Sequence, residues 1–179
     1  MRNWSICMLL VIIFSAYSPT LRAQESQTPI FWANAGIGVS SMDLSFGASL
    51  NFVASESDLI TIRFCRNQQF ALFTNGTYVW DFGAMYGLRT NSTSTYASIS
   101  SGLALVGGAN LGKYIPGQGW FSGHYEEITY MTVGIPFEAQ FFWRPSSFLG
   151  IGICANANLN MKKSFAGAQL CLQFGKFEL

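Results

Sequence analysis

Residues 78–88 have the sequence YVWDFGAMYGL, in which large apolar side chains alternate with small or polar ones. One face carries Tyr78, Trp80, Phe82, Ala84, Tyr86 and Leu88, and the other carries Val79, Asp81, Gly83, Met85 and Gly87. Because successive side chains of a β-strand point to opposite faces, this alternation predicts a strand between two different environments. About ten residues is also the length at which a tilted strand crosses a bilayer.

The same alternation recurs along the rest of the chain. Large apolar side chains occupy one face of each segment, and Gly, Ser, Asn, Gln and a few charges occupy the other. The segments are 31–40, 42–52, 60–65, 97–105, 131–141, 149–158 and 166–175. With residues 78–88, we predict about eight strands of about ten residues each.

Composition indicates which face meets lipid. Half of the 179 residues are hydrophobic and only 11% are charged, whereas a soluble domain carries about 25% charged residues. A secreted soluble barrel, such as a lipocalin-like carrier, would need a water-facing surface rich in Lys, Glu and Thr. The polar face here is small and nearly uncharged, which suits a narrow interior. We therefore predict an all-β fold, a single antiparallel up-and-down transmembrane β-barrel.

The N-terminal segment is typical of an export signal. Arg2 precedes an apolar run from Ile6 to Ala16, and Ala23 offers a small residue for cleavage. The run is shorter than the roughly 20 residues that a membrane-spanning helix needs. We expect residues 1–23 to be a signal peptide and 24–179 to form the outer-membrane β-barrel domain.

The connections between predicted strands differ in length at the two ends. Short polar segments lie near Ala54–Asp58, Thr90–Thr95 and Pro145–Ser147, and longer ones at Asn67–Thr77 and Leu111–Glu127. Outer-membrane barrels have short periplasmic turns and longer outward loops. With both termini on the periplasmic side, both long segments fall outside the cell.

These features, with the stretches Trp80–Gly87 and Gly134–Gln140, resemble the small outer-membrane β-barrel proteins of Gram-negative bacteria. The architecture is similar to the OmpA/OmpX type, and the likeness is greatest to uncharacterised members of that group. The resemblance implies assembly by the barrel assembly machinery, which often recognises a terminal aromatic residue. Here Phe177 lies near the end of the chain and Leu179 is last, which departs from that pattern.

Four charged residues are predicted to point into the lumen: Asp43, Arg63, Asp81 and Glu138. Buried charge is costly without a partner, so we expect Arg63 to pair with Glu138 or Asp81. Such a network either links the strands or gates a residual water path. The first role is favoured because eight-stranded barrels are usually filled.

The three cysteines after residue 23, Cys65, Cys154 and Cys171, also fall on the inward face. If Lys162–Lys163 is a two-residue hairpin loop, Cys154 and Cys171 lie directly opposite each other. Opposed residues approach disulfide distance only in the closer pair type. A disulfide and a pair of small apolar thiols are both consistent with this placement. The spacing does not match a metal site.

The segment Leu111–Glu127 is rich in aromatic residues, which favours either packing onto the barrel rim or a surface-binding patch. The aromatic residues are Tyr114, Trp120, Phe121 and Tyr125. The only histidine, His124, lies in the same segment, beside Ser122 and Glu126–Glu127. Some small outer-membrane barrels are lipid A hydrolases that use His, Ser and Glu on strands facing the bilayer. A loop histidine does not match that arrangement, so we assign no catalytic residue.

We therefore expect a non-enzymatic barrel that supports the outer membrane or binds a surface ligand through the 111–127 loop. A narrow pore and, less favoured, a lipid A-modifying hydrolase are the alternatives. The expected partners are outer-membrane lipid, lipopolysaccharide and the barrel assembly machinery. No cofactor or metal is expected, and a formal net charge of +1 does not indicate nucleic-acid binding.

Overall fold

The strands form a closed antiparallel barrel in a computed structural model that describes residues 30–70, 76–92, 94–115 and 124–175. Each strand pairs with the next along the chain, and β8 pairs with β1. The strands are β1 Phe31–Ser40, β2 Asp43–Val53, β3 Asp58–Gln68, β4 Tyr78–Asn91, β5 Thr95–Ile115, β6 His124–Trp143, β7 Leu149–Asn160 and β8 Phe165–Gly175. The predicted up-and-down barrel of about eight strands is confirmed. The predicted signal peptide lies outside the described residues.

The sequence alternation becomes an alternation of burial in the wall of the barrel. In β4, Asp81 is fully buried in the lumen while Phe82 is 54% exposed on the outer surface. The interior of an eight-stranded barrel has room for few large side chains, so most of them point outward. Large exposed apolar side chains occur on every strand and include Ile37, Phe52, Phe64, Leu103, Val133, Ile153 and Leu170. Among the described residues, no helix is long and apolar enough to cross a membrane.

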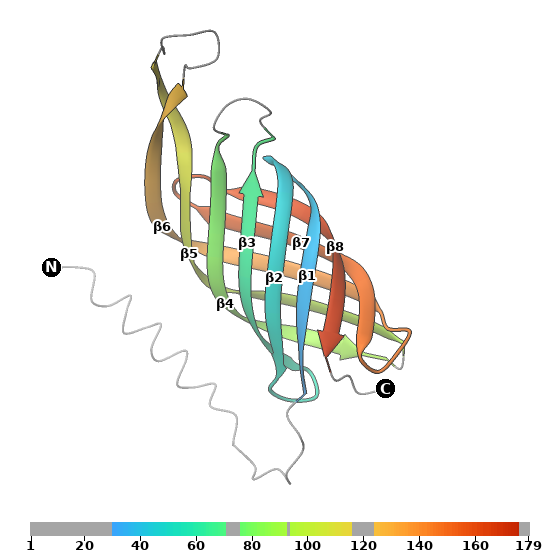
Figure 1. The fold of residues 1–179 in the computed structure, drawn as a ribbon. Helices are drawn as coiled ribbons and strands as arrows, with labels where there is room; N and C mark the ends of the chain where they lie inside the picture. Colours follow the sequence, from blue (N-terminus) through green and yellow to red (C-terminus); the bar gives the residue numbers. More distant parts are fainter. Residues whose placement is uncertain (1–29, 71–75, 93, 116–123, 176–179) are drawn as a thin grey trace, which may run out of the picture.

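The two ends of the barrel differ in their connections. β1 begins and β8 ends at the same end, where Trp32 pairs with Gly175. The β2–β3, β4–β5 and β6–β7 turns lie at that end, and each joins its strands within a few residues. β3 and β5 end, and β4 and β6 begin, at the opposite end (Figure 1). The structure therefore puts both long segments at the end away from the termini.

β5 and β6 are the longest strands, with 21 and 20 residues. β4 pairs with β5 only as far as Ala109, opposite Tyr78, and β7 pairs with β6 only from Gly134, opposite Asn160. Beyond these points, β5 and β6 continue as a two-stranded hairpin that projects past the other strands (Figure 1). The prediction of a loop over the whole of 111–127 is wrong, because its described parts extend the strands.

The tight β1–β2 turn overturns two details of the predicted orientation. Ser41 and Met42 form the β1–β2 turn, and Asp43 has a φ of 79°, in the left-handed region. Turn residues do not follow strand alternation, so Met42, predicted on the outer face, is buried. Asp43, predicted in the lumen, is exposed at the rim and accepts a hydrogen bond from the Phe70 backbone N–H at 3.1 Å.

Candidate functional site

Arg63 lies at the centre of the lumen, between two carboxylates from other strands. Its Nη2 is 2.5 Å from Oδ2 of Asp81 on β4, and its Nη1 is 3.3 Å from Oε2 of Glu138 on β6. Nη1 also donates to the Phe137 carbonyl at 3.0 Å. Arg63 is 2% exposed, Asp81 0% and Glu138 7%. Because a buried charge needs a partner, this trio holds β3, β4 and β6 in one arrangement across the interior.

Amides continue this charge network around the lumen. Asn158 on β7 donates to Asp81 Oδ2 at 2.8 Å, and Gln140 donates to Glu138. Asn34 on β1 donates to Gln140 Oε1 at 3.1 Å, and Gln140 Nε2 also lies 3.4 Å from Asn51 Oδ1 on β2. Six of the eight strands, β1, β2, β3, β4, β6 and β7, therefore contribute side chains to one connected polar interior.

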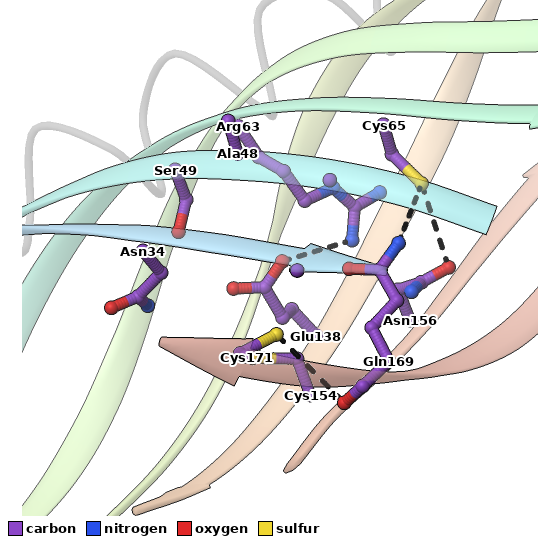
Figure 2. A pocket seen from close by; sticks show the side chains of 12 residues that line it. Asn34, Ala48, Ser49, Arg63, Cys65, Glu138, Cys154, Asn156, Gln169 and Cys171 are labelled. Atoms are coloured by element: carbon purple, nitrogen blue, oxygen red, sulfur yellow. Dashed lines mark hydrogen bonds and ion pairs between the residues drawn. The ribbon is translucent and has the colours of Figure 1, made fainter. Parts of the chain in front are cut away.

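A narrow cavity remains beside Arg63 and Glu138, with room for about one water molecule. Figure 2 shows Arg63, Glu138, Cys65 and Asn156 converging on it. Buried polar atoms without a protein partner face this part of the lumen, among them Asn34 Oδ1 and Asn156 Nδ2. Such a space fits trapped water better than an organic ligand, because ligand pockets run to several hundred Å³.

Apolar clusters close both ends of the described lumen. At the end near the termini, Trp32, Tyr96 and Phe142 pack together with Leu59. The guanidinium of Arg144 lies 4.3 Å from the ring centre of Tyr96 and 5.1 Å from that of Trp32, which is cation–π geometry. At the opposite end, the cluster contains Met42, Cys65, Val79, Ala104, Val106 and Phe165. The charged middle of the lumen therefore lies between two apolar clusters.

The three described cysteines are buried free thiols. Cys154 pairs with Gln169 and Cys171 pairs with Gly152, so the predicted direct opposition of the two cysteines is wrong. The reason is that Asn158 pairs with Phe165, which centres the wider β7–β8 turn between Met161 and Lys162, one residue earlier than predicted. The amide of Asn160 holds this wider turn, since its Oδ1 accepts from the backbone N–H groups of Lys162 and Lys163. The cysteines are diagonal neighbours, both lining the central cavity (Figure 2).

The projecting hairpin carries part of the predicted surface patch. Tyr114 on β5 and Tyr125 on β6 stack edge to face, with ring centres 5.1 Å apart. A register shift lies between Leu111 and Tyr114, where the two strands lose their one-to-one pairing. Trp120 and Phe121 lie outside the described residues. His124 is the first residue of β6, so its backbone belongs to the hairpin rather than to the membrane-facing wall.

Comparison with known proteins defines the fold. No family model and no curated protein sequence matches the chain. Among solved structures, the N-terminal β-barrel domain of Pseudomonas aeruginosa OprF matches with a TM-score of 0.58 at 12% identity, over 83% of this chain and 98% of that one. Neisserial surface protein A (NspA) matches with a TM-score of 0.58 at 12% identity, over 86% of this chain and 100% of that one.

The chain has the fold of the eight-stranded outer-membrane barrels. The attachment invasion locus protein Ail of Yersinia pestis, solved with the heparin analogue sucrose octasulfate, has the same fold. It matches with a TM-score of 0.52 at 7% identity, over 83% of this chain and 97% of that one. Identities this low establish the architecture alone. The predicted likeness to the OmpA/OmpX type is confirmed at that level.

Two features of the interior were missed from the sequence. The Arg144 cluster was missed because Arg144 follows the predicted strand 131–141, although it continues the inward parity of Glu138 and Gln140. The role of Asn158 as a partner of Asp81 was missed because an amide pairs with a distant strand only through barrel closure. Extending each alternation by a few residues would have found Arg144, whereas no sequence signal identifies the Asn158 contact.

Proposed function

We propose that this protein is an integral outer-membrane barrel that acts without catalysis, as a membrane-embedded support for a surface-binding hairpin. The observation that carries the proposal is the contrast between a filled lumen and a projecting hairpin. Buried polar and charged side chains occupy the interior, while β5 and β6 extend well past the neighbouring strands. A barrel built for transport would instead keep its lumen open.

The outer surface supports a location in the outer membrane. Its exposed apolar side chains form a continuous band around the barrel, which fits lipid and lipopolysaccharide acyl chains as neighbours. Export through a cleaved signal peptide and insertion by the barrel assembly machinery complete this proposal. We expect the mature chain to begin at Gln24 and to run in the outer-membrane fraction as a heat-modifiable protein, as N-terminal sequencing and unheated gels would measure.

Labelling of engineered cysteines on intact cells tests the orientation of the barrel. Glu126→Cys places a thiol on the hairpin, and Glu56→Cys places a matched thiol on the β2–β3 turn; both positions are exposed. A membrane-impermeant maleimide should label Glu126→Cys on intact cells and Glu56→Cys only after permeabilisation. Cys65, Cys154 and Cys171 are buried and serve as the unlabelled background. Equal labelling, or the reverse order, would contradict the proposal.

The packed lumen disfavours the narrow-pore alternative. Purified protein in planar bilayers should give no unitary conductance steps, because the Arg63 network and both apolar clusters occupy the path. Regular conductance steps that change with Glu138→Gln would favour a gated pore instead.

A further inference from the structure

The outer face of the projecting hairpin carries two tyrosine rings and a carboxylate. Tyr114 on β5 pairs with Tyr125 on β6, and their rings meet edge to face, with planes inclined by 60°. Glu127 lies two residues from Tyr125 and therefore on the same face of β6. Tyr114 is 51% exposed, Glu127 is exposed and Tyr125 is half-buried. We call these three residues the aromatic corner; two inclined rings and one carboxylate meet there at the surface.

A β-bulge in β5 places Tyr114 on this face. Leu111 pairs with Glu127 just below the bulge. If that register continued, Tyr114 would pair with His124 and its side chain would point to the other face of the hairpin. Two residues of β5 instead lie opposite one residue of β6, and Tyr114 pairs with Tyr125. Bulges often re-aim a side chain next to a functional site, and this one completes the aromatic corner.

A hydrogen bond holds the carboxylate of the corner. The hydroxyl of Tyr78, the first residue of β4, donates to Glu127 Oε1 at 3.1 Å. Among the described residues, both ion pairs involve Arg63 in the lumen, so Glu127 forms none. The aromatic corner therefore combines exposed ring surface with a fixed negative charge that has no ion-pair partner in the described part of the chain.

We propose that the aromatic corner binds a quaternary ammonium group such as that of choline, an inference that rests on the proposed surface-binding function. The faces of aromatic rings attract cations, and groups of aromatic side chains recognise choline and methylated lysine in this way. Tyr114 and Tyr125 supply two inclined walls, and Glu127 supplies the opposite charge.

Hydration favours a quaternary ammonium over a primary one at this position. A primary ammonium is compact and strongly hydrated, so it loses favourable contacts with water when it approaches ring carbons. A quaternary ammonium carries methyl groups in place of N–H donors, and these methyl groups pack against the rings without leaving a donor unpaired. The ligand class is therefore a cation with an apolar envelope.

Arg66 places a positive charge beside the corner. Its guanidinium lies 4.8 Å from the ring centre of Tyr78, whose hydroxyl holds Glu127. Arg66 is exposed on the outer face of β3. A cation next to a site for a cation suits a zwitterion such as phosphocholine, whose phosphate would meet the guanidinium. The quaternary ammonium could thus come from free choline or from a phosphocholine headgroup, which the experiment distinguishes.

The test uses the full chain folded in nanodiscs of phosphatidylglycerol and phosphatidylethanolamine, so that no lipid carries choline. Added choline should shift the backbone amide resonances of Tyr114, Tyr125 and Glu127 with a Kd of about 1 to 30 mM, because exposed cation–π contacts are individually weak. The neutral isostere 3,3-dimethylbutan-1-ol and the primary amine methylammonium should each bind at least about tenfold more weakly. All titrations are run at one ionic strength.

Matched charge variants compare the two faces of β6. Glu127→Gln should weaken choline binding at least about fivefold, because it removes the charge but keeps an oxygen that can accept from Tyr78. Glu126→Gln removes an equal charge from the opposite face and should stay within about twofold.

Matched ring variants test the aromatic wall. Tyr125→Leu keeps an apolar side chain but removes the ring, so it should weaken choline binding at least about fivefold. Tyr125→Phe keeps the ring and should stay within about twofold. Heat-modifiability checks that each variant folds, and the comparison of choline with its neutral isostere needs no variant.

Tighter binding of phosphocholine than of choline, with the gain lost in Arg66→Gln, would identify a headgroup as the source of the ammonium. Equal or weaker binding of phosphocholine would identify a free quaternary amine. Three outcomes would overturn the proposal: no choline-dependent shifts at the corner, equal binding of the neutral isostere or methylammonium, or equal losses in Glu126→Gln and Glu127→Gln. None of these depends on orientation in the cell, so equal labelling of Glu126→Cys and Glu56→Cys separately identifies failure of the proposed function.

Discussion

The two halves of β6 differ in what surrounds them. The lower half, Gly134–Trp143, pairs with β5 on one side and β7 on the other, and its residues alternate strictly between buried and exposed. The upper half, His124–Val133, pairs with β5 alone, and none of its described side chains is buried. Alternation in the sequence therefore decides burial only where the barrel closes around the strand. Where the barrel no longer closes around β6, its side chains are at least partly exposed on both faces of the strand.

Removing Arg63 should have the largest effect, because it anchors the lower half of β6 to β3 and β4. Arg63→Ala leaves Asp81 and Glu138 buried without their cation, which should cost about 3 to 5 kcal/mol, less any relief from protonation or water entry. Urea unfolding in lipid vesicles measures the loss.

Adding Glu138→Gln or Asp81→Asn to Arg63→Ala should recover part of the loss in each case. The closer contact of Asp81 predicts the larger recovery for Asp81→Asn. A neutral Arg63→Ala would show that water already screens these carboxylates.

An arginine placed in each half of β6 tests the comparison directly. Ile135, on the outer face of the lower half, is 46% exposed, and Ile128 in the upper half is 54% exposed. Ile135→Arg should cost about 2 to 4 kcal/mol if this surface meets the lipid midplane, whereas Ile128→Arg should cost well under that amount in water. Folding yield into vesicles and urea midpoints measure both. Similar costs would mean that the two halves share one environment.

Gly134, at the boundary of the two halves, is a poor control for these substitutions. Parity puts it in the lumen, yet an added Cβ would collide with the amide oxygen of Asn158. Gly134→Ser must therefore displace Asn158 from Asp81. It should destabilise the barrel more than is expected for a small side chain that points into the lumen.

The β7–β8 register predicts that Cys154 and Cys171 stay reduced. Diagonal neighbours in a sheet lie about 7 to 8 Å apart, with their Cβ atoms somewhat closer, whereas a disulfide needs Cβ atoms about 3.5 to 4.5 Å apart. Protein purified without reductant should take up one alkyl group at each of Cys65, Cys154 and Cys171 after unfolding, as intact mass would record. A deficit of two groups would mean that the strands shift enough to bond.

Asp58 should have the smallest effect, because it is the first residue of β3, at the barrel end where β1 begins. Hydrogen bonds from Ser55 and then Tyr86 hold the pKa of its carboxyl below the ordinary value of 3.8. The stabilisation is therefore present above about pH 4 and is lost as the pH falls through the lowered pKa. Asp58→Asn should lower the urea midpoint slightly at neutral pH and match the unmutated protein once the pH lies well below the lowered pKa. A difference in urea midpoint that does not change with pH would exclude titration of Asp58 as its cause.

Much of the interior was predictable because its residues follow the same strand alternation as the wall of the barrel. Arg63, Asp81 and Glu138 follow strict alternation in the middle of strands, where parity is reliable, so their side of the sheet could be assigned. Asp43 and Met42 were misplaced because they belong to a turn, where a left-handed residue breaks the parity. The pairing of Cys154 was misplaced because the centre of a turn sets the register, and moving that centre by one residue moves every partner by two.

By itself, the sequence determined the strands, their two faces, the closed barrel and the lipid-compatible exterior, because these depend on a local period of two and on composition. Only the tertiary structure decided that Arg63 meets both carboxylates, that apolar clusters close both ends of the described lumen, and that β6 outruns β7. Those outcomes depend on the stagger between strands, which arises when the sheet closes and neighbouring strands of unequal length come into register. No local pattern records that stagger, so the projection of β5 and β6 past their neighbours appears only once the barrel is built.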